Sequence, residues 1–111
     1  MSRPIISGYE WRQRIRVVAS PALFPVGCAL TAQVRSTRQS PQVLTELTTA
    51  NSKITRIDDN TIELLIPSSD SLDWQLREVV MDCVRTDTPT PQHLGFRLRV
   101  RVAQPVTRGL P

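Results

Sequence analysis

Apolar and polar residues alternate with a period of two along most of this chain, and a helical period of 3.6 is hardly present. The clearest example is the segment 94–104, LGFRLRVRVAQ. One face of this segment consists of Phe96, Leu98, Val100 and Val102. The opposite face carries Arg97, Arg99 and Arg101. This alternation predicts a strand with one side in a core and the other side in water.

Further strands are predicted wherever the same alternation recurs between proline, glycine and Asp-Asn turn signals. These segments are 9–18, 28–36, 43–49, 53–57, 61–67 and 77–87. Side chains expected to face inward are Tyr9, Trp11, Ile15, Val17, Cys28, Leu30, Ala32, Val34, Ile62, Leu64, Ile66, Val79, Met81 and Cys83. Only the segment 68–75, SSDSLDWQ, is expected to form a short helical turn, because a Ser or Asp cap precedes Leu72 and Trp74.

About seven short strands in 111 residues predict an all-β fold, an antiparallel Ig-like β-sandwich. A small barrel is the alternative. The length suits a single domain over residues 1–111, with short N-terminal (1–8) and C-terminal (105–111) arms. If the strands are lettered in order on an Ig-type layout, Cys28 falls on strand B and Cys83 on strand F.

The chain is basic, with 14 Lys and Arg residues against 10 Asp and Glu residues and a net charge of +4. Such a balance suits binding to nucleic acid and equally suits docking onto an acidic protein surface. The N-terminal residues show no signal peptide, and no segment is suited to cross a membrane as a helix. We therefore expect a protein that is made and folded in a cytoplasm and does not bind membranes.

Two cysteines and one histidine offer little scope for metal binding or catalysis. Cys28 and Cys83 do not have zinc-ligand spacing, and they are expected either as buried thiols or as a disulfide that a reducing cytoplasm disfavours. His93 lies in a loop without a neighbouring acid, and the pair Asp58 and Asp59 is more typical of a turn than of a cation site. We predict no catalytic, cofactor-binding or metal-binding residue, no cofactor, and no enzymatic activity.

Arginine rows are the one concentrated polar feature. Their members are Arg12, Arg14 and Arg16 in the first strand and Arg97, Arg99 and Arg101 in the last. The first and last strands of a sandwich often lie side by side, in which case these six form one basic face that docks a partner. The alternative is a solvated face that prevents aggregation through a sheet edge. A protein partner is favoured over nucleic acid because no aromatic side chains stand among the arginines to stack on bases.

The order of segments resembles small Ig-like structural proteins of tailed bacteriophages, in particular the N-terminal domain of phage baseplate upper proteins. The resemblance covers nearly the whole chain and rests on order and spacing more than on any single motif. The matching segments are ALTAQVRS (29–36), VLTEL (43–47), NTIELLIPSSDSLDW (60–74), VVMDCVRTD (79–87) and LGFRLRVRVAQPVTR (94–108).

This resemblance implies a virion protein that occurs in several copies and docks onto other virion proteins, in the tail or baseplate or, alternatively, in the capsid or head–tail connection. It carries over no catalytic residue. Met81 stands where the family often has an aromatic residue, and the long C-terminal portion of baseplate upper proteins is not present before Pro111. A small nucleic-acid-binding or host-modulating protein is the alternative of a different class.

Overall fold

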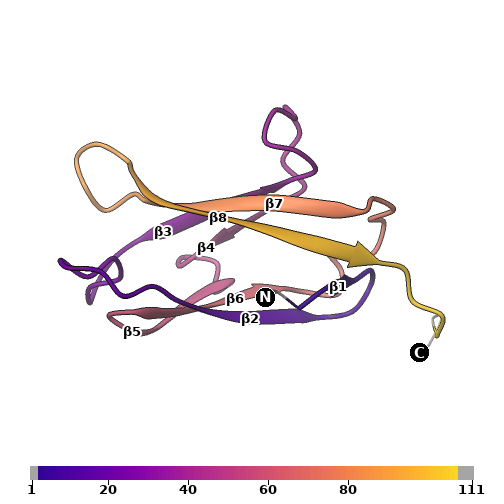
Figure 1. Cartoon of the computed structure of the whole chain (residues 1–111), viewed down its shortest axis with the longest axis horizontal. Coiled ribbons are helices and arrows are strands. Elements are labelled where there is room, and N and C mark those ends of the chain that lie inside the picture. The colour runs from indigo at the N-terminus through magenta and orange to yellow at the C-terminus, as the bar shows by residue number, and fades with distance from the viewer. Residues whose placement is uncertain (1–2, 108–111) are drawn as a thin grey trace.

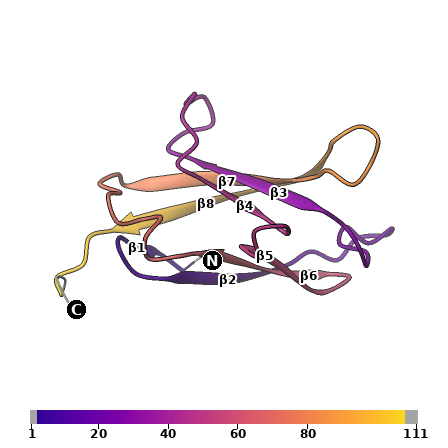
Figure 2. The ribbon, with the colours of Figure 1, turned by 180° about the vertical axis from the view of Figure 1, so that it is seen from behind.

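Two stacked β-sheets form the fold in the computed structural model, which describes residues 3–107 (Figure 1). Figure 2 shows the same two layers from behind. Within residues 3–107 the chain contains eight strands and no helix, so the protein is all-β as predicted. The strands are β1 (Ile5–Ile6), β2 (Trp11–Arg16), β3 (Leu30–Arg35), β4 (Thr45–Thr48), β5 (Ile54–Asp58), β6 (Thr61–Ile66), β7 (Glu78–Arg85) and β8 (Gln92–Ala103).

The larger sheet has the order β1-β8-β7-β3-β4 and the smaller sheet the order β2-β6-β5. Neighbouring strands are antiparallel except at β1, which runs parallel to β8 with Ile5 opposite Val102. The larger sheet is therefore mixed, and the prediction of a purely antiparallel sandwich was wrong at this strand. Strand β1 is also the one that alternation did not reveal, because a two-residue strand is too short to show a period.

Burial follows the predicted alternation closely in β3, β6 and β7. Side chains that are almost fully buried between the sheets include Leu30, Val34, Leu47, Ile62, Ile66, Val79 and Val100. Each such side chain contributes on the order of 1.5–3 kcal/mol by leaving water. The loop before β3 also supplies Phe24, which is fully buried and meets the ring of Phe96 edge-on at 6.5 Å.

The helical turn predicted over 68–75 does not form. Instead the chain makes two successive turns, in which the amide of Asp70 donates to the carbonyl of Pro67 and the amide of Trp74 to that of Ser71. One of the candidate caps is used elsewhere, since the Ser71 hydroxyl is fully buried and accepts the amide of Gly8 at 3.0 Å. Tertiary contacts have thus replaced the local cap that the sequence suggested.

A polar network fastens the N-terminal segment to these turns and to the end of β8. The Ser7 hydroxyl donates to the carbonyl of Trp74 at 2.6 Å, and the side-chain amide of Gln104 donates to the same carbonyl at 2.8 Å. These contacts hold β1 against β8. Part of the predicted N-terminal arm (1–8) is therefore a strand, while residues 1–2 and 108–111 of the two predicted arms lie outside the described residues.

No helix long and apolar enough to span a membrane occurs in the described part of the chain.

Candidate functional site

The β8 arginine row, which we define as Arg97, Arg99 and Arg101, lies on the outer face of the five-stranded sheet. All three side chains are exposed, because the alternating apolar residues of β8 turn toward the core. Their cross-strand neighbours on β7 are Asp82, Val80 and Glu78. In the described part of the chain the row has one ion pair, from Arg99 to Glu78 at 3.7 Å. Arg97 and Arg101 form no ion pair within this part of the chain, although Asp82 and Glu78 stand opposite them on β7.

The β2 arginine row, which we define as Arg12, Arg14 and Arg16, lies on the outer face of the three-stranded sheet. Part of its charge is offset within the sheet, because Glu63 on β6 accepts from Arg12 at 3.0 Å and from Arg14 at 3.2 Å. Hydrogen bonds from Arg14 and Arg12 lower the pKa of Glu63. Glu10 also binds Arg12 at 3.0 Å, and the bonds to Glu10 and Glu63 raise the pKa of Arg12.

The two arginine rows do not meet. Strand β2 pairs with β6, whereas β8 lies between β7 and β1 in the other sheet, so the rows lie on the two outer faces of the sandwich (Figure 1). The expectation that the first and last strands combine their arginines into one basic face is thereby corrected. The short strand β1 takes the position beside the end of β8 that this expectation gave to β2.

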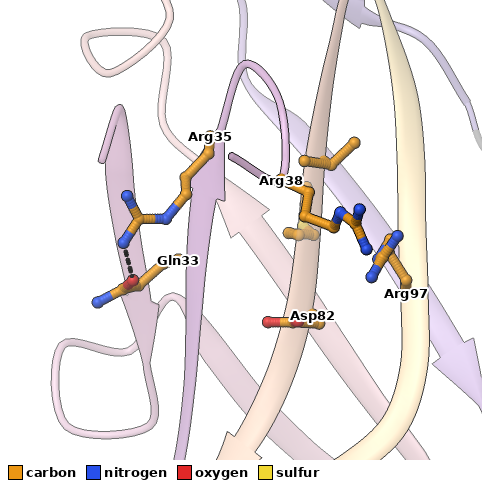
Figure 3. Close-up of a pocket in the computed structure, with 7 residues that line it drawn as sticks. Gln33, Arg35, Arg38, Asp82 and Arg97 are labelled. Carbon is orange, nitrogen blue, oxygen red and sulfur yellow. Dashed lines mark hydrogen bonds between the residues drawn. The ribbon is translucent and has the colours of Figure 1, made fainter. Parts of the chain in front are cut away.

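Two arginines that the sequence did not single out join the β8 row. Arg35 and Arg38 line a shallow open pocket of about 90 Å³ together with Gln33, Asp82 and Arg97. Figure 3 shows the guanidinium groups of Arg38 and Arg97 turned toward one another above the sheet. Two like charges that line one small pocket favour an anionic group between them. The pocket has room for a carboxylate or a phosphate but is far smaller than the sites of drug-sized ligands, about 300–1,000 Å³.

Arg38 reaches the pocket from the loop 36–44, which stands off the outer face of the sheet in both views (Figures 1 and 2). Arg35 fixes this loop by donating to the carbonyl of Ser40 at 2.7 Å and to the side chain of Gln33 at 2.6 Å. Val80 lies on the outer side of β7 and lines the pocket with Arg38, and it is only 8% exposed. Loop placement of this kind depends on tertiary contacts and cannot be read from alternation.

His93 has an acidic neighbour that the sequence did not indicate. Its Nε2 lies 2.9 Å from a carboxylate oxygen of Asp82 on β7, and its Nδ1 accepts the amide of Gly95 at 2.9 Å. Because Nδ1 is an acceptor, the proton resides on Nε2 and is donated to Asp82. Gly95 has a left-handed φ of 83° within an irregularity of the β7–β8 pairing, and this shift brings His93 within reach of Asp82.

Cys28 and Cys83 are both buried free thiols, so the alternative of a disulfide is not realised in the structure. Burial raises the pKa of Cys83 to about 12 and also raises the pKa of Cys28. Cys83 is on β7, and Cys28 precedes β3, the neighbour of β7 in the same sheet. The two cysteines therefore do not link one sheet to the other, as their lettering on strands B and F had suggested.

Acidic residues in the turn between β5 and β6 act as turn formers. Asp58 accepts the amide of Asn60 at 2.8 Å, and this bond lowers the pKa of Asp58. Asp59 pairs with Arg56, which also donates to the carbonyl of Phe24. No group of three His, Cys, Asp or Glu side chains suited to hold a metal ion occurs within residues 3–107.

Comparison with protein-family models gives no match, and comparison with curated proteins gives no significant match either.

Proposed function

We propose that this chain is a non-enzymatic structural protein of a tailed-phage virion, a component of the tail or baseplate that docks onto other virion proteins. The observation that carries the docking role is the β8 arginine row, which is exposed and has a single ion pair within the described residues. A surface with unbalanced charge of one sign favours a partner of the opposite sign and excludes partners of like sign. The resemblance in the order of segments supports the assignment to a virion.

We further propose that the sandwich is Ig-like, with β2 to β8 as strands B, C, C′, D, E, F and G and β1 as a short first strand. The sheet orders β8-β7-β3-β4 and β2-β6-β5 then read G-F-C-C′ and B-E-D, which supports this assignment. Compared with the lettering expected from the sequence, β2 and β3 move on by one letter and β4 becomes C′, because the first strand of the domain is the short β1, while β5 to β8 keep the letters D to G.

Purified particles of the source phage provide the test of the virion role. Mass spectrometry is expected to find this protein in the particle, at several copies relative to a tail protein of known number. Cross-linking within the particle then separates the alternatives, because contacts with tail proteins support the baseplate role and contacts with the major capsid protein support capsid decoration. Complete absence of the protein from pure infectious particles would overturn the proposal.

Binding to nucleic acid is the second candidate, and the placement of Arg38 and Arg97 at one small pocket favours it (Figure 3). Arginines in this arrangement are able to bind a phosphate group. Affinity for DNA that falls steeply with increasing salt, and that decreases in the variant R38Q/R97Q, would support this candidate. Absence of binding at low salt would reject it and leave the docking role in place.

A further inference from the structure

We infer that the open edge of β8 binds an extended segment of a partner protein as an added strand, and that this segment alternates acidic and apolar residues. Strand β8 is paired with β7 along one edge over residues 92–101. On its other edge, within the described residues, only Val102 and Ala103 of β8 pair with a strand, and that strand is β1. This inference rests on the docking function proposed above and specifies the partner's chemistry.

Backbone groups of the β8 arginine row point toward the open edge. The amide of Val102 donates to the carbonyl of Arg77, just before β7, whereas the carbonyl of Ala103 accepts the amide of Ser7 beside β1. Because the two edges of a strand are used by alternate residues, Arg97, Arg99 and Arg101 present their N–H and C=O groups to the edge shared with β1. These groups are placed to form backbone hydrogen bonds with an added strand.

The inner side of the same stretch of β8 is covered incompletely. Val100 and Val102, which lie nearest to β1, are 0% and 8% exposed. Leu94, Phe96 and Leu98, further from β1, are only partly buried. A strand added beyond β8 would place every second side chain against these residues, and apolar side chains at those positions would complete their burial.

The outer side of the added strand would meet the β8 arginine row. Directly opposed charges of opposite sign stabilise a strand pair, and like charges destabilise it. Neither Arg97 nor Arg101 forms an ion pair with a carboxylate of the described chain. Acidic side chains at the alternate positions of the partner strand would therefore be stabilising, which gives the partner its acidic and apolar pattern.

A second copy of this chain does not fit the edge. In an antiparallel pair, a residue that presents its backbone groups to the shared edge lies opposite a residue of the other strand that also presents its backbone groups to that edge. Joining two β8 edges would thus place Arg97, Arg99 and Arg101 of one copy opposite the same arginines of the other. The resulting like-charge pairs are destabilising. The partner strand is therefore expected from a different, acidic protein.

Titration with a short capped peptide of alternating glutamate and valine tests the inference, and a lysine–valine peptide serves as its control. Backbone amide exchange measured by NMR gives a signature specific to strand addition. In the free protein the amides of Leu98 and Val100 are expected to exchange slowly and those of Arg97, Arg99 and Arg101 quickly. Saturation with the acidic peptide is expected to slow the exchange of the three arginine amides selectively.

Variants separate edge binding from simple charge attraction. We expect R97Q/R99Q/R101Q to weaken binding of the acidic peptide by roughly tenfold, from the loss of opposed charge pairs. The matched variant R12Q/R14Q/R16Q has the same change in net charge on the other face and is expected to bind normally. Arg99→Pro removes one N–H from the open edge, where proline is tolerated, and is expected to weaken binding while the fold persists.

Three outcomes would overturn the inference: no binding of the acidic peptide, binding without protection of the arginine amides, or equal weakening by the two triple variants. The exchange measurement uses the unmodified protein and remains decisive if a variant fails to fold. Failure here with the protein present in virions would reject edge binding alone. Peptide binding with the protein absent from virions would instead reject the virion role alone.

Discussion

At the scale of the residue, Ser71 is one of the candidate caps of the expected helical turn, and it makes a long-range contact instead. Its hydroxyl is fully buried and is the acceptor for the amide of Gly8, which links the turns after β6 to the N-terminal segment. Replacing Ser71 with Ala leaves this amide without its acceptor, and we expect the free energy of unfolding to fall by about 1–3 kcal/mol.

Urea unfolding measures this loss, and Ser69→Ala is the matched control because Ser69 is exposed in the same pair of turns. An unchanged stability of Ser71→Ala would show that the contact with Gly8 contributes nothing.

Cys83 gives a second prediction at this scale. Only 2% of this residue is exposed, and burial raises the pKa of its thiol to about 12. Because the thiolate is the reactive form, we expect iodoacetamide at pH 8 to leave Cys83 unmodified in the folded protein. Mass spectrometry of digested protein checks this, with guanidinium-unfolded protein as the positive control. Rapid modification of Cys83 without unfolding would contradict this burial.

At the scale of the element, one carboxylate connects strands of both sheets. Asp70, in the turns after β6, accepts from the hydroxyl of Thr45 on β4 at 2.8 Å and from Lys53, which precedes β5, at 2.7 Å. Partial burial acts to raise the pKa of Asp70, but the bonds from Lys53 and Thr45 outweigh it and the pKa is lowered. Asp70 is thus positioned to stabilise the contact between the two sheets.

We expect Asp70→Asn to lower the free energy of unfolding by about 1–2 kcal/mol, because the ion pair is lost while the amide still accepts from Thr45. Thermal and urea unfolding check this value. Asp73→Asn, a change of an exposed residue in the same segment, is expected to have little effect. Equal effects of the two variants would show that a general change of charge, and not this contact, is responsible.

At this scale the sequence predicted the faces of the strands but not how the strands pair. Alternation placed the inward faces of β3, β6, β7 and β8 correctly, because the period of a strand follows from its own backbone. Pairing between strands depends on contacts between residues far apart in the chain. Alternation therefore could not predict the separation of the two arginine rows or the parallel strand β1. The contact of His93 with Asp82 was hidden for the same reason, since an irregular register at Gly95 creates it.

The β8 arginine row was therefore predicted from the sequence, whereas the contribution of Arg35 and Arg38 and the separation of the two rows were not. Arg97, Arg99 and Arg101 were identified from their alternation and lie exposed on one face, as expected. Arg38 gave no periodic signal, because it belongs to a loop whose position is set by the bonds of Arg35 to Ser40 and Gln33.

At the scale of the whole molecule, the titration of buried and paired groups predicts how stability depends on pH. Hydrogen bonds from Arg85, assisted by the amide of Ala29, lower the pKa of Asp87 from 3.8 to about 2. A carboxylate with a lowered pKa stabilises the fold above its unfolded pKa, and this stabilisation disappears as the pH falls through the folded value. We therefore expect the free energy of unfolding to decrease as the pH falls from about 4 to 2.

On the alkaline side a pKa is raised instead of lowered, so stability is lost as the pH rises instead of as it falls. Burial raises the pKa of Cys83 from 9.0 to about 12, so between these values the unfolded chain releases a proton that the folded chain keeps. Stability should then fall as the pH rises from 9 to 12 and be greatest between the two limbs. Urea unfolding across the pH range measures the profile, and Asp87→Asn and Cys83→Ala should reduce the slope of the acidic and alkaline limbs respectively. A limb that keeps its slope in the corresponding variant would show that other groups control it.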